Sequence, residues 1–383
     1  MSGPLQGLKV IEMAGIGPGP FACMLLADMG ADVIRVDRPG GGALGATDNP
    51  ADVLQRGRRS IAVDLKSPEG VEVVLQLLES ADVLTEGYRP GVMEKLGLGP
   101  DVCLARNPRL VYGRMTGWGQ EGPLSHAAGH DINYIALTGA LAAIGRDDSG
   151  PVPPLNLLGD FGGGSLYLVM GILAALFERG HSGRGQVIDA AITDGVISLM
   201  GAIQGFAGIG LWDASQRQSN MLDGGAHYYD TYQCADGEWI SIGSIEPQFY
   251  ALLMEKLGME NAEIDFAAQF DKQRWPALKA EIAARIVSKT RQQWCEIMEG
   301  TDVCFAPVLN MEEAPQHPHN KARNSFVNVQ GSIQTAPAPR FDRTPGEVGR
   351  LPVTAGTDSD EILAELGIEA ATIASLKEKG AVA

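Results

Sequence analysis

The chain has 383 residues, 45% of them hydrophobic, which is enough for two domains with ordinary cores. Asp and Glu (47) outnumber Lys and Arg (30), and the net charge of -17 opposes a general attraction to nucleic acid or to an anionic membrane. The five cysteines are widely spaced and include no CxxC pair, which argues against a disulfide framework or a thiolate zinc site and favours a reduced, cytoplasmic protein.

The first residues lack the basic and apolar segments of a signal peptide. The most apolar stretch, Ser165 to Phe177, is too short for a membrane span, and we expect it to be a buried helix.

The first part of the chain alternates strands and helices. Apolar periodicity, Pro20 at a helix start and Gly30 at its end predict a β-α-β unit, and the pattern then repeats. Such alternation implies a parallel sheet that is covered by helices on both faces and binds ligands at the carboxyl ends of its strands. The predicted strands are 8–14, 31–37, 60–65, 82–88 and 110–119, and the predicted helices are 20–30 and 69–81.

The composition changes near residue 205 to a stretch rich in Gly, Asp and Gln, which indicates a linker. We therefore expect an α/β fold with a large Rossmann-like domain, formed by 1–195 and completed by 335–383, and a smaller α/β domain over 226–310. Linkers are expected at 196–225 and 311–334. The remaining expected elements are strands at 238–244 and 303–309, helices at 247–257 and 275–299, an extended strap at 334–352, and a closing helix that is capped by Ser359 and ends at Gly367.

The segment GIGPGP, Gly15 to Pro20, lies between a predicted strand and helix and resembles a dinucleotide-binding turn. Pro20 occupies the position of the third glycine, and Arg38 follows the acid that would hold a ribose. An NAD-dependent enzyme is therefore a weak alternative, and we interpret these glycines as a tight turn.

Basic residues gather near strand ends despite the acidic balance of the chain. Guanidinium groups bind phosphate oxygens in pairs, so the cluster suggests a site for several phosphates, although a solvated loop would have the same composition. The cluster comprises Arg35, Arg38, Arg56, Arg58, Arg59, Lys66 and Arg89.

Three titratable groups stand at predicted junctions between elements. The pair His130-Asp131 precedes a helical pattern, so Asp131 could be the acid of a helix start and His130 a structural histidine. Asp160 lies before three glycines and could either cap a helix or sit in an apolar pocket, ready to exchange a proton. Glu246 precedes Pro247 and could also be a cap.

Four motifs in order, AGHDINY, LNLLGDFGGG, NMLDGGA and IEPQFY, resemble the α-methylacyl-CoA racemase branch of the family III CoA-transferase superfamily. The resemblance runs from Leu8 to about Leu309 and weakens towards the C-terminus. It implies that His130 and Asp160 transfer protons and that Glu246 is associated with the histidine. It also implies a set of residues that contact CoA or the acyl thioester. We add Arg58 and Arg59 of the basic cluster to this set. These binding residues are Arg38, Arg58, Arg59, Val63, Asp64, Leu65, Lys66, Arg89, Gly129, Asp131, Ile132, Asn133 and Tyr134.

The resemblance predicts a racemase of fatty acid metabolism that interconverts (R)- and (S)-2-methylacyl-CoA thioesters, and an interlocked homodimer. A thioester stabilises the α-carbanion as an enolate, and inversion needs two groups on opposite sides of the carbon. We expect backbone N–H groups around Asp131 to face the enolate oxygen. No metal or redox cofactor is required, since CoA is part of the substrate. The alternatives are a CoA transferase in which Asp160 forms an acyl anhydride, and a paralogue that binds acyl-CoA without catalysis.

Overall fold

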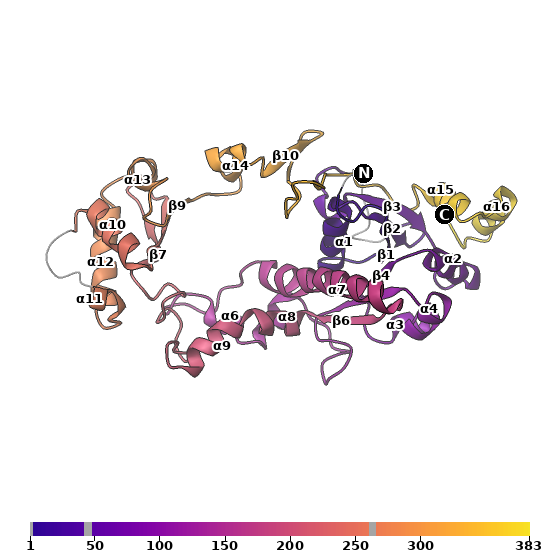
Figure 1. Cartoon of the computed structure of the whole chain (residues 1–383), viewed down its shortest axis with the longest axis horizontal. Coiled ribbons are helices and arrows are strands. Elements are labelled where there is room, and N and C mark those ends of the chain that lie inside the picture. The colour runs from indigo at the N-terminus through magenta and orange to yellow at the C-terminus, as the bar shows by residue number, and fades with distance from the viewer. Residues whose placement is uncertain (1–2, 42–47, 260–265) are drawn as a thin grey trace. The chain divides into compact units, whose positions relative to one another are not determined.

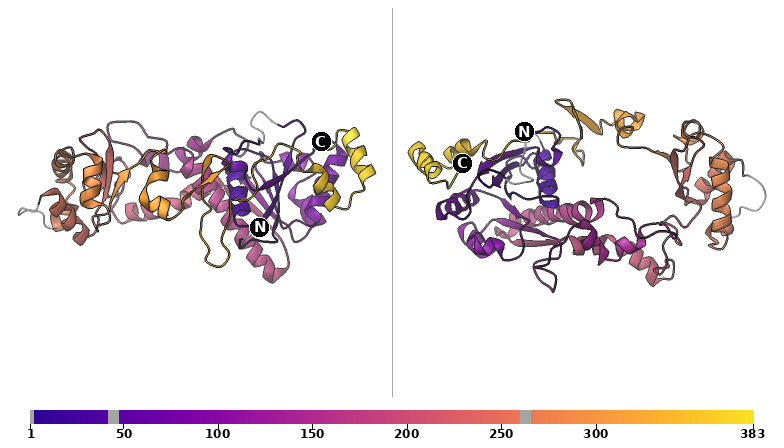
Figure 2. Two further views of the ribbon diagram at one scale, coloured as in Figure 1. Left: turned by 90° about the horizontal axis from the view of Figure 1, so that it is seen from above. Right: turned by 180° about the vertical axis from the view of Figure 1, so that it is seen from behind.

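The computed structural model describes residues 3–41, 48–259 and 266–383, and the chain forms two compact units (Figure 1). The first unit comprises Met1–Thr138, Leu155–Leu199 and Asn324–Ala383, and the second comprises Gly139–Pro154 and Met200–Arg323. Both ends of the chain belong to the first unit (Figure 2). The sequence did not predict that residues 139–154 belong to the second unit. Residues 200–225 and 311–323, expected as linkers, are also part of the second unit.

The first unit is built on a six-stranded parallel sheet with the order β3-β2-β1-β4-β5-β6. This is the order of a doubly wound sheet, in which the direction of winding changes between β1 and β4 and leaves a crevice at their carboxyl ends. The predicted parallel sheet is thereby confirmed, whereas β6 was not predicted. The strands are β1 (Lys9–Met13), β2 (Asp32–Asp37), β3 (Arg58–Ala62), β4 (Val83–Glu86), β5 (Val111–Thr116) and β6 (Val187–Ala191).

Helices cover both faces of this sheet. On one face, alternate strand residues such as Ile11 and Ile34 share a core with α2 (Pro68–Glu79), α3 (Val92–Lys95), α4 (Pro100–Arg106), α15 (Ser359–Glu365) and α16 (Ala370–Glu378). The C-terminal helices therefore lie beside α2 (Figure 1). On the other face, α1 (Pro18–Asp28) packs on β1 and β2, and α7 (Leu166–Ser182) packs on β5 and β6.

Local sequence signals explain where these helices begin. Ser67 accepts a hydrogen bond from Gly70 N at 3.2 Å and Pro68 occupies the first turn of α2, as is usual for a capped start. The closing helix α15 differs from expectation, because its N-cap is Asp358 and Ser359 is the first helical residue. The Ser359 hydroxyl is bound instead to backbone groups of Ala62 and Ala383.

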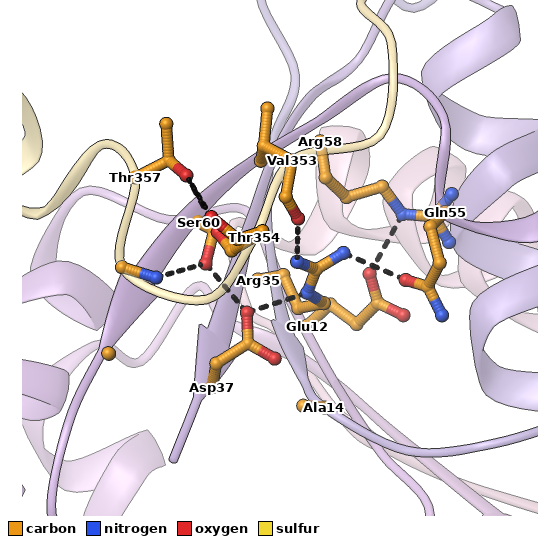
Figure 3. Close-up of polar contacts among 12 residues, drawn as sticks. Glu12, Ala14, Arg35, Asp37, Gln55, Arg58, Ser60, Val353, Thr354 and Thr357 are labelled. Atoms are coloured by element: carbon orange, nitrogen blue, oxygen red, sulfur yellow. Dashed lines mark hydrogen bonds and ion pairs between the residues drawn. The ribbon is translucent and has the colours of Figure 1, made fainter. Parts of the chain in front are cut away.

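Buried polar side chains hold the C-terminal segment against the sheet (Figure 3). The Arg35 guanidinium donates to Asp37 (2.8 Å), to Gln55 (2.8 Å) and to the carbonyl of Val353 (3.0 Å). Ser60 donates to the same Asp37 carboxylate at 2.6 Å. The bond to Val353 holds the irregular 336–358 segment, which overlaps the strap predicted over 334–352, against the sheet.

The apolar stretch at Ser165 is part of a longer helix than predicted. A π-helix, η2 (Leu157–Ser165), runs directly into α7, and the combined helix Leu157–Ser182 is long and apolar enough, at a mean hydropathy of 1.5, to meet the length and composition of a membrane span. Leu168 and Ile172 are nevertheless fully buried against the sheet, as in a core helix. Composition alone is therefore weak support for a span.

The second unit contains an antiparallel sheet of β7 (Tyr229–Gln233), β8 (Trp239–Gly243) and β9 (Phe305–Val308). The helices α10 (Pro247–Leu257), α12 (Trp275–Ile286) and α13 (Arg291–Met298) share its core. The single helix expected over 275–299 is two helices, because Thr290 and Gln293 form a capping box that starts α13.

Short elements complete the two units. They are η1 (Val53–Gln55), α5 (Asp131–Ala136), α6 (Ala140–Ala143), α8 (Ile192–Leu199), α9 (Gly201–Gly208), α11 (Phe266–Phe270), η3 (Ala314–Gln316), α14 (Pro318–Ala322), β10 (Phe326–Val329) and β11 (Ser332–Thr335).

Candidate active site

A cavity of about 420 Å³ opens at the carboxyl ends of β1, β4 and β5, at the place where the winding of the sheet changes direction. The turn Gly15–Pro20 after β1 forms one wall, and residues 86–88 at the end of β4 form another. His130 and Asp160 both line this cavity, so the fold brings together the two residues that were predicted to transfer protons.

His130 is the N-cap residue of α5, with its side chain exposed. Its backbone N–H donates to Asn133 Oδ1 at 3.1 Å, and its carbonyl accepts the N–H groups of Asn133 and Tyr134. His130 also lines a second cavity of about 420 Å³, together with Arg89 and Trp118. The imidazole therefore stands between two adjoining spaces, which is not the place of a buried structural histidine.

A tightly packed tyrosine fixes the turn before His130. The Tyr134 hydroxyl donates to the Gly129 carbonyl, and its ring packs edge-on against Trp118 at 4.8 Å between centroids. A Cβ atom at Gly117 would lie 2.0 Å from the Tyr134 ring, and one at Gly129 would lie 2.7 Å from it. Glycine is therefore required at both positions for the ring to occupy this place.

Asp160 lies inside the π-helix η2 and not at a helix cap, which was one of the two alternatives for this residue. Burial raises the pKa of its carboxyl group, and the nearby Asp131 carboxylate adds to that rise, while a hydrogen bond from Asn156 and the proximity of His130 lower it. A carboxyl group whose pKa lies above its ordinary value can be protonated and deprotonated nearer neutral pH. This suits a residue that must both take up and return a proton.

The GIGPGP segment forms a tight turn into α1, as interpreted from the sequence. Gly17 has a φ of 71°, a conformation that favours glycine, and Pro18 opens the helix. A Cβ atom at Gly17 would lie 3.4 Å from Asp160 Oδ2. Ser165 links the two segments by donating to the carbonyls of Pro18 (2.7 Å) and Asp160 (3.0 Å). The turn therefore forms the wall next to Asp160.

Arg58 and Arg59 do not join the other predicted phosphate contacts. They pair with Val33 and Ile34 at the amino end of β2, whereas Arg38 follows its carboxyl end, about 15 Å away along the strand. Arg58 is fully buried; it donates to Glu12 at 3.0 Å (Figure 3) and to the carbonyls of Arg56 and Pro20. The expectation of one cluster was wrong because it ignored the direction in which β3 runs.

Arg59 is also engaged within the fold. It forms ion pairs with Asp32 (2.7 Å) and Glu365 (2.8 Å), which tie β3 to β2 and α15. The guanidinium is therefore occupied at the edge of the sheet opposite to the cavity.

The other predicted contacts lie at the carboxyl edge. Arg38, Lys66 and Arg89 are exposed there, after β2, β3 and β4, and so are Ile132 and Asn133 on α5. Val63 differs, because it is fully buried in the core and its N–H is bound to the carbonyl of Asp37. Its side chain is thus a packing residue. Asp64 and Leu65 are half-buried beside it.

Glu246 belongs to the second unit. It is the N-cap residue of α10, and its side chain makes no capping hydrogen bond within the described chain and is exposed, so capping does not explain the carboxylate. Burial and the neighbouring Glu246 raise the pKa of the Cys304 thiol. Cys304 also lines a cavity of about 710 Å³ within this unit.

Two acidic residues of the first cavity were missed in the sequence. Glu12 lies within β1 and Glu86 ends β4, and both are buried and line the cavity. Burial raises the pKa of Glu86, while bonds from Tyr88 N–H and Arg114 lower it. An acid within an apolar strand such as KVIEM was the available signal, since a buried carboxylate requires a partner.

Comparison with known proteins agrees with this arrangement. The model of the family described as CoA-transferase family III matches residues 5–359. The chain belongs to this family. It is 47% identical over 374 residues to alpha-methylacyl-CoA racemase of Mus musculus, covering 97% of this chain and 96% of the mouse protein. It is 46% identical over 366 residues to the protein of the same name from Homo sapiens, covering 95% and 93%.

A solved structure shares the fold of this family member. A CAIB/BAIF family protein from Brucella suis superposes with a TM-score of 0.81 at 28% identity, covering 96% of this chain and all (100%) of that chain. The resemblance found in the sequence is therefore confirmed at the level of the family and of its racemase relatives. The roles of His130, Asp160 and Glu246 stay predictions.

Proposed function

We propose that this protein is an α-methylacyl-CoA racemase that inverts the α-carbon of 2-methylacyl-CoA thioesters. The observation that carries the proposal is the placement of His130 and Asp160 on one cavity at the carboxyl edge of the sheet. The names of the relatives with 46% and 47% identity support the same reaction.

In this mechanism the α-carbon lies between the His130 imidazole and the Asp160 carboxyl group. For one enantiomer neutral His130 removes the proton and protonated Asp160 returns one to the other face. For the opposite enantiomer the Asp160 carboxylate is the base and the imidazolium is the acid. The raised pKa of Asp160, caused by burial and by Asp131, brings the two groups closer in proton affinity, which favours exchange in both directions.

The enolate oxygen needs hydrogen-bond donors in this scheme. The N–H groups of Asn133 and Tyr134 are bound to the carbonyl of His130. We therefore assign the role to the N–H groups of Asp131 and Ile132 at the start of α5.

The CoA moiety is proposed to bind along the carboxyl edge. Arg38, Lys66 and Arg89 are the exposed cations there, and guanidinium and ammonium groups suit phosphate oxygens. Gly129 and Tyr134 line the adjoining cavity, where the thioester arm would pass. CoA enters as part of the substrate, and the chemistry uses neither a metal nor a redox cofactor.

We further propose a cytoplasmic, interlocked homodimer in which Glu246 supports a histidine of the site. In the described chain the five cysteines are free, as suits a reducing compartment. On α7, Leu166, Met170 and Phe177 are exposed apolar residues that a partner could cover. Sedimentation at low micromolar concentration should give about twice the 40.5 kDa chain mass, and a stable, fully active monomer would contradict the dimer.

The test of function is conversion of one pure enantiomer. With (R)-2-methylacyl-CoA as the only substrate, chiral analysis should show the (S)-thioester accumulating to equilibrium, with no acyl acceptor added. A CoA transferase would instead require an acceptor acid, and hydroxylamine would trap an acyl group on Asp160. Absence of inversion together with such a trapped acyl group would replace the racemase proposal by the transferase.

A further inference from the structure

The side chain of Asp131 connects the two predicted proton-transfer residues. Asp131 follows His130 in the chain and begins α5, and its Oδ2 accepts the backbone N–H of Asp160 at 2.7 Å. We infer that Asp131 is a positioning residue for Asp160: its carboxylate holds the backbone of Asp160 and keeps a negative charge beside the Asp160 carboxyl group. This inference rests on the proposed racemase function.

The contact is close and enclosed. A Cβ atom at Gly159 would lie 2.3 Å from Asp131 Oδ2, so only glycine at 159 lets the π-helix approach the carboxylate this nearly. Asp131 is 7% exposed, and its second oxygen, Oδ1, is buried without a hydrogen-bond partner in the described part of the chain. A helix cap alone would not need this arrangement, because Asp131 binds the backbone of another element.

Few charged groups near Asp160 counteract the effect of the Asp131 charge. From the α5 segment, His130 and Tyr134 face Asp160, and Asn156 faces it from the start of its own helix. The turn before α1 contributes glycines and prolines, and the packed residues of α8 are the apolar Ile192 and Val196.

Other charged groups lie further along the cavity wall. Arg89 acts on Tyr134, and Glu12 and Glu86 line the same cavity as Asp160. Burial is the larger cause of the raised pKa of Asp160, and the Asp131 charge is the next. Since the other contributors that act on it, Asn156 and His130, lower the pKa, Asp131 is the charged group that sustains the rise.

This arrangement bears directly on two-way proton transfer. A carboxylate with an ordinary pKa is a weak base, whereas a general acid or base works best when its pKa approaches the working pH. By raising the proton affinity of Asp160 and fixing its backbone, Asp131 makes the carboxyl group a better match for an imidazole across the α-carbon.

The experiment removes the negative charge of Asp131 and keeps its hydrogen bond to the Asp160 backbone. In Asp131→Asn the amide oxygen can still accept the Asp160 N–H, but the negative charge is gone. We expect the acidic limb of the pH profile of kcat/KM to move to lower pH and kcat to fall. The displacement must be equal for both enantiomers, because the ratio of their kcat/KM values is fixed by the equilibrium constant of the substrate.

A second variant has the opposite sign. Asn156 is exposed, and its hydrogen bond lowers the pKa of Asp160, so Asn156→Ala should move the acidic limb to higher pH. Asp101→Asn, an exposed acid in the first turn of α4, is the matched control and should leave the profile unchanged. Asp131→Ser removes the same charge with a smaller side chain and serves if the asparagine variant does not fold.

The carboxyl group of Asp160 can also be titrated without turnover. In the full-length protein labelled with ¹³C at aspartate carboxyl groups, the signal lost in Asp160→Asn identifies Asp160. Its midpoint should fall in Asp131→Asn and rise in Asn156→Ala. An unchanged midpoint in a folded Asp131 variant overturns the inference, even if the wild type is an active racemase. An inactive wild type would overturn the proposed function instead, while the titration still decides the role of Asp131.

Discussion

Buried charged groups have different surroundings at the two edges of the parallel sheet. Arg58 begins β3 at the amino edge, and its buried guanidinium donates to Glu12 and to the carbonyls of Arg56 and Pro20. At the carboxyl edge, Asp131 leaves one buried oxygen without a partner in the described chain, and Asp160 has a raised pKa caused first by burial. The Arg58 guanidinium thus serves the fold, whereas the Asp160 carboxyl group lines a cavity that a substrate can enter.

The comparison teaches how to separate structural from functional charges in this protein. Arg58 and Arg38 look alike in the sequence, since each follows or begins a strand near other basic residues. Burial and hydrogen bonding separate them, because Arg58 is fully buried whereas Arg38 is exposed at the edge that binds ligands in doubly wound sheets. Substitutions of both kinds of residue test this distinction.

Removing either predicted proton-transfer group should have the largest effect. His130→Ala and Asp160→Asn should each lower the rate of racemisation by about 10²–10⁴-fold, the usual contribution of a general acid or base. Steady-state kinetics with each enantiomer measures this loss. Asp101→Asn serves as the control. Retention of most activity in either variant would remove that residue from the mechanism.

Breaking the buried ion pair between Arg58 and Glu12 should damage stability. Arg58→Met leaves Glu12 buried beside an uncharged side chain, and breaking one partner of a buried pair costs about 3–5 kcal/mol. Chemical unfolding should therefore show a correspondingly smaller free energy of unfolding. The more exposed pair at Arg59 gives a contrast, since Arg59→Met should cost about 1 kcal/mol or less. Equal losses at the two positions would contradict the assignment of Arg58 to the fold.

The cations of the two edges should differ in their effect on substrate binding. Arg38→Ala should weaken acyl-CoA binding about tenfold, since a hydrogen bond to a charged group contributes about 1.5–3 kcal/mol, part of which is lost to solvent at an exposed site. Added salt should weaken acyl-CoA binding to the wild type more than acyl-CoA binding to this variant. Arg59→Ala should leave affinity unchanged. Calorimetric titration measures the acyl-CoA affinity of each variant. Loss of affinity in Arg59→Ala but not in Arg38→Ala would place Arg59 in the phosphate site.

The smallest expected effect is on stability at the carboxyl edge. The pKa of Asp160 is higher in the folded protein than its ordinary value, chiefly because of burial, so this group favours folding at low pH and loses that contribution as pH rises through its folded pKa. Asp160→Asn should therefore slightly raise the melting temperature at pH 7, and the gain should vanish below the ordinary value of 3.8. A lower melting temperature at pH 7 would show that the carboxylate stabilises the fold.

Much of the sheet could be predicted because its signals are local. The strands at Lys9, Asp32 and Val83 are short apolar runs, and Pro and Gly mark the ends of the first helix. The π-helix could not be predicted in this way. Its Leu157–Asp160 part reads as a strand, and only packing against α5 and α8 explains its helical path.

The site was predicted in part for the same reason. His130 and Asp160 stand in motifs that resemble a known family, and the fold places both on one cavity. The arginine cluster was wrong, because Arg38 follows the end of β2 whereas Arg58 begins the parallel strand β3, which places them at opposite edges of the sheet. The buried Glu12 was missed, since its partner Arg58 is far along the chain and joins it only through the sheet.

The central claim is that the carboxyl edge carries a two-base proton transfer, and the deuterium content of the inverted product tests it most directly. Wild-type enzyme is incubated in heavy water with (R)-2-methylacyl-CoA, and the (S)-thioester is analysed for deuterium at the α-carbon by mass spectrometry. The account predicts that every inverted molecule carries solvent deuterium at that carbon after prolonged incubation. An inverted product that retains its original α-hydrogen, even after prolonged incubation, would contradict it.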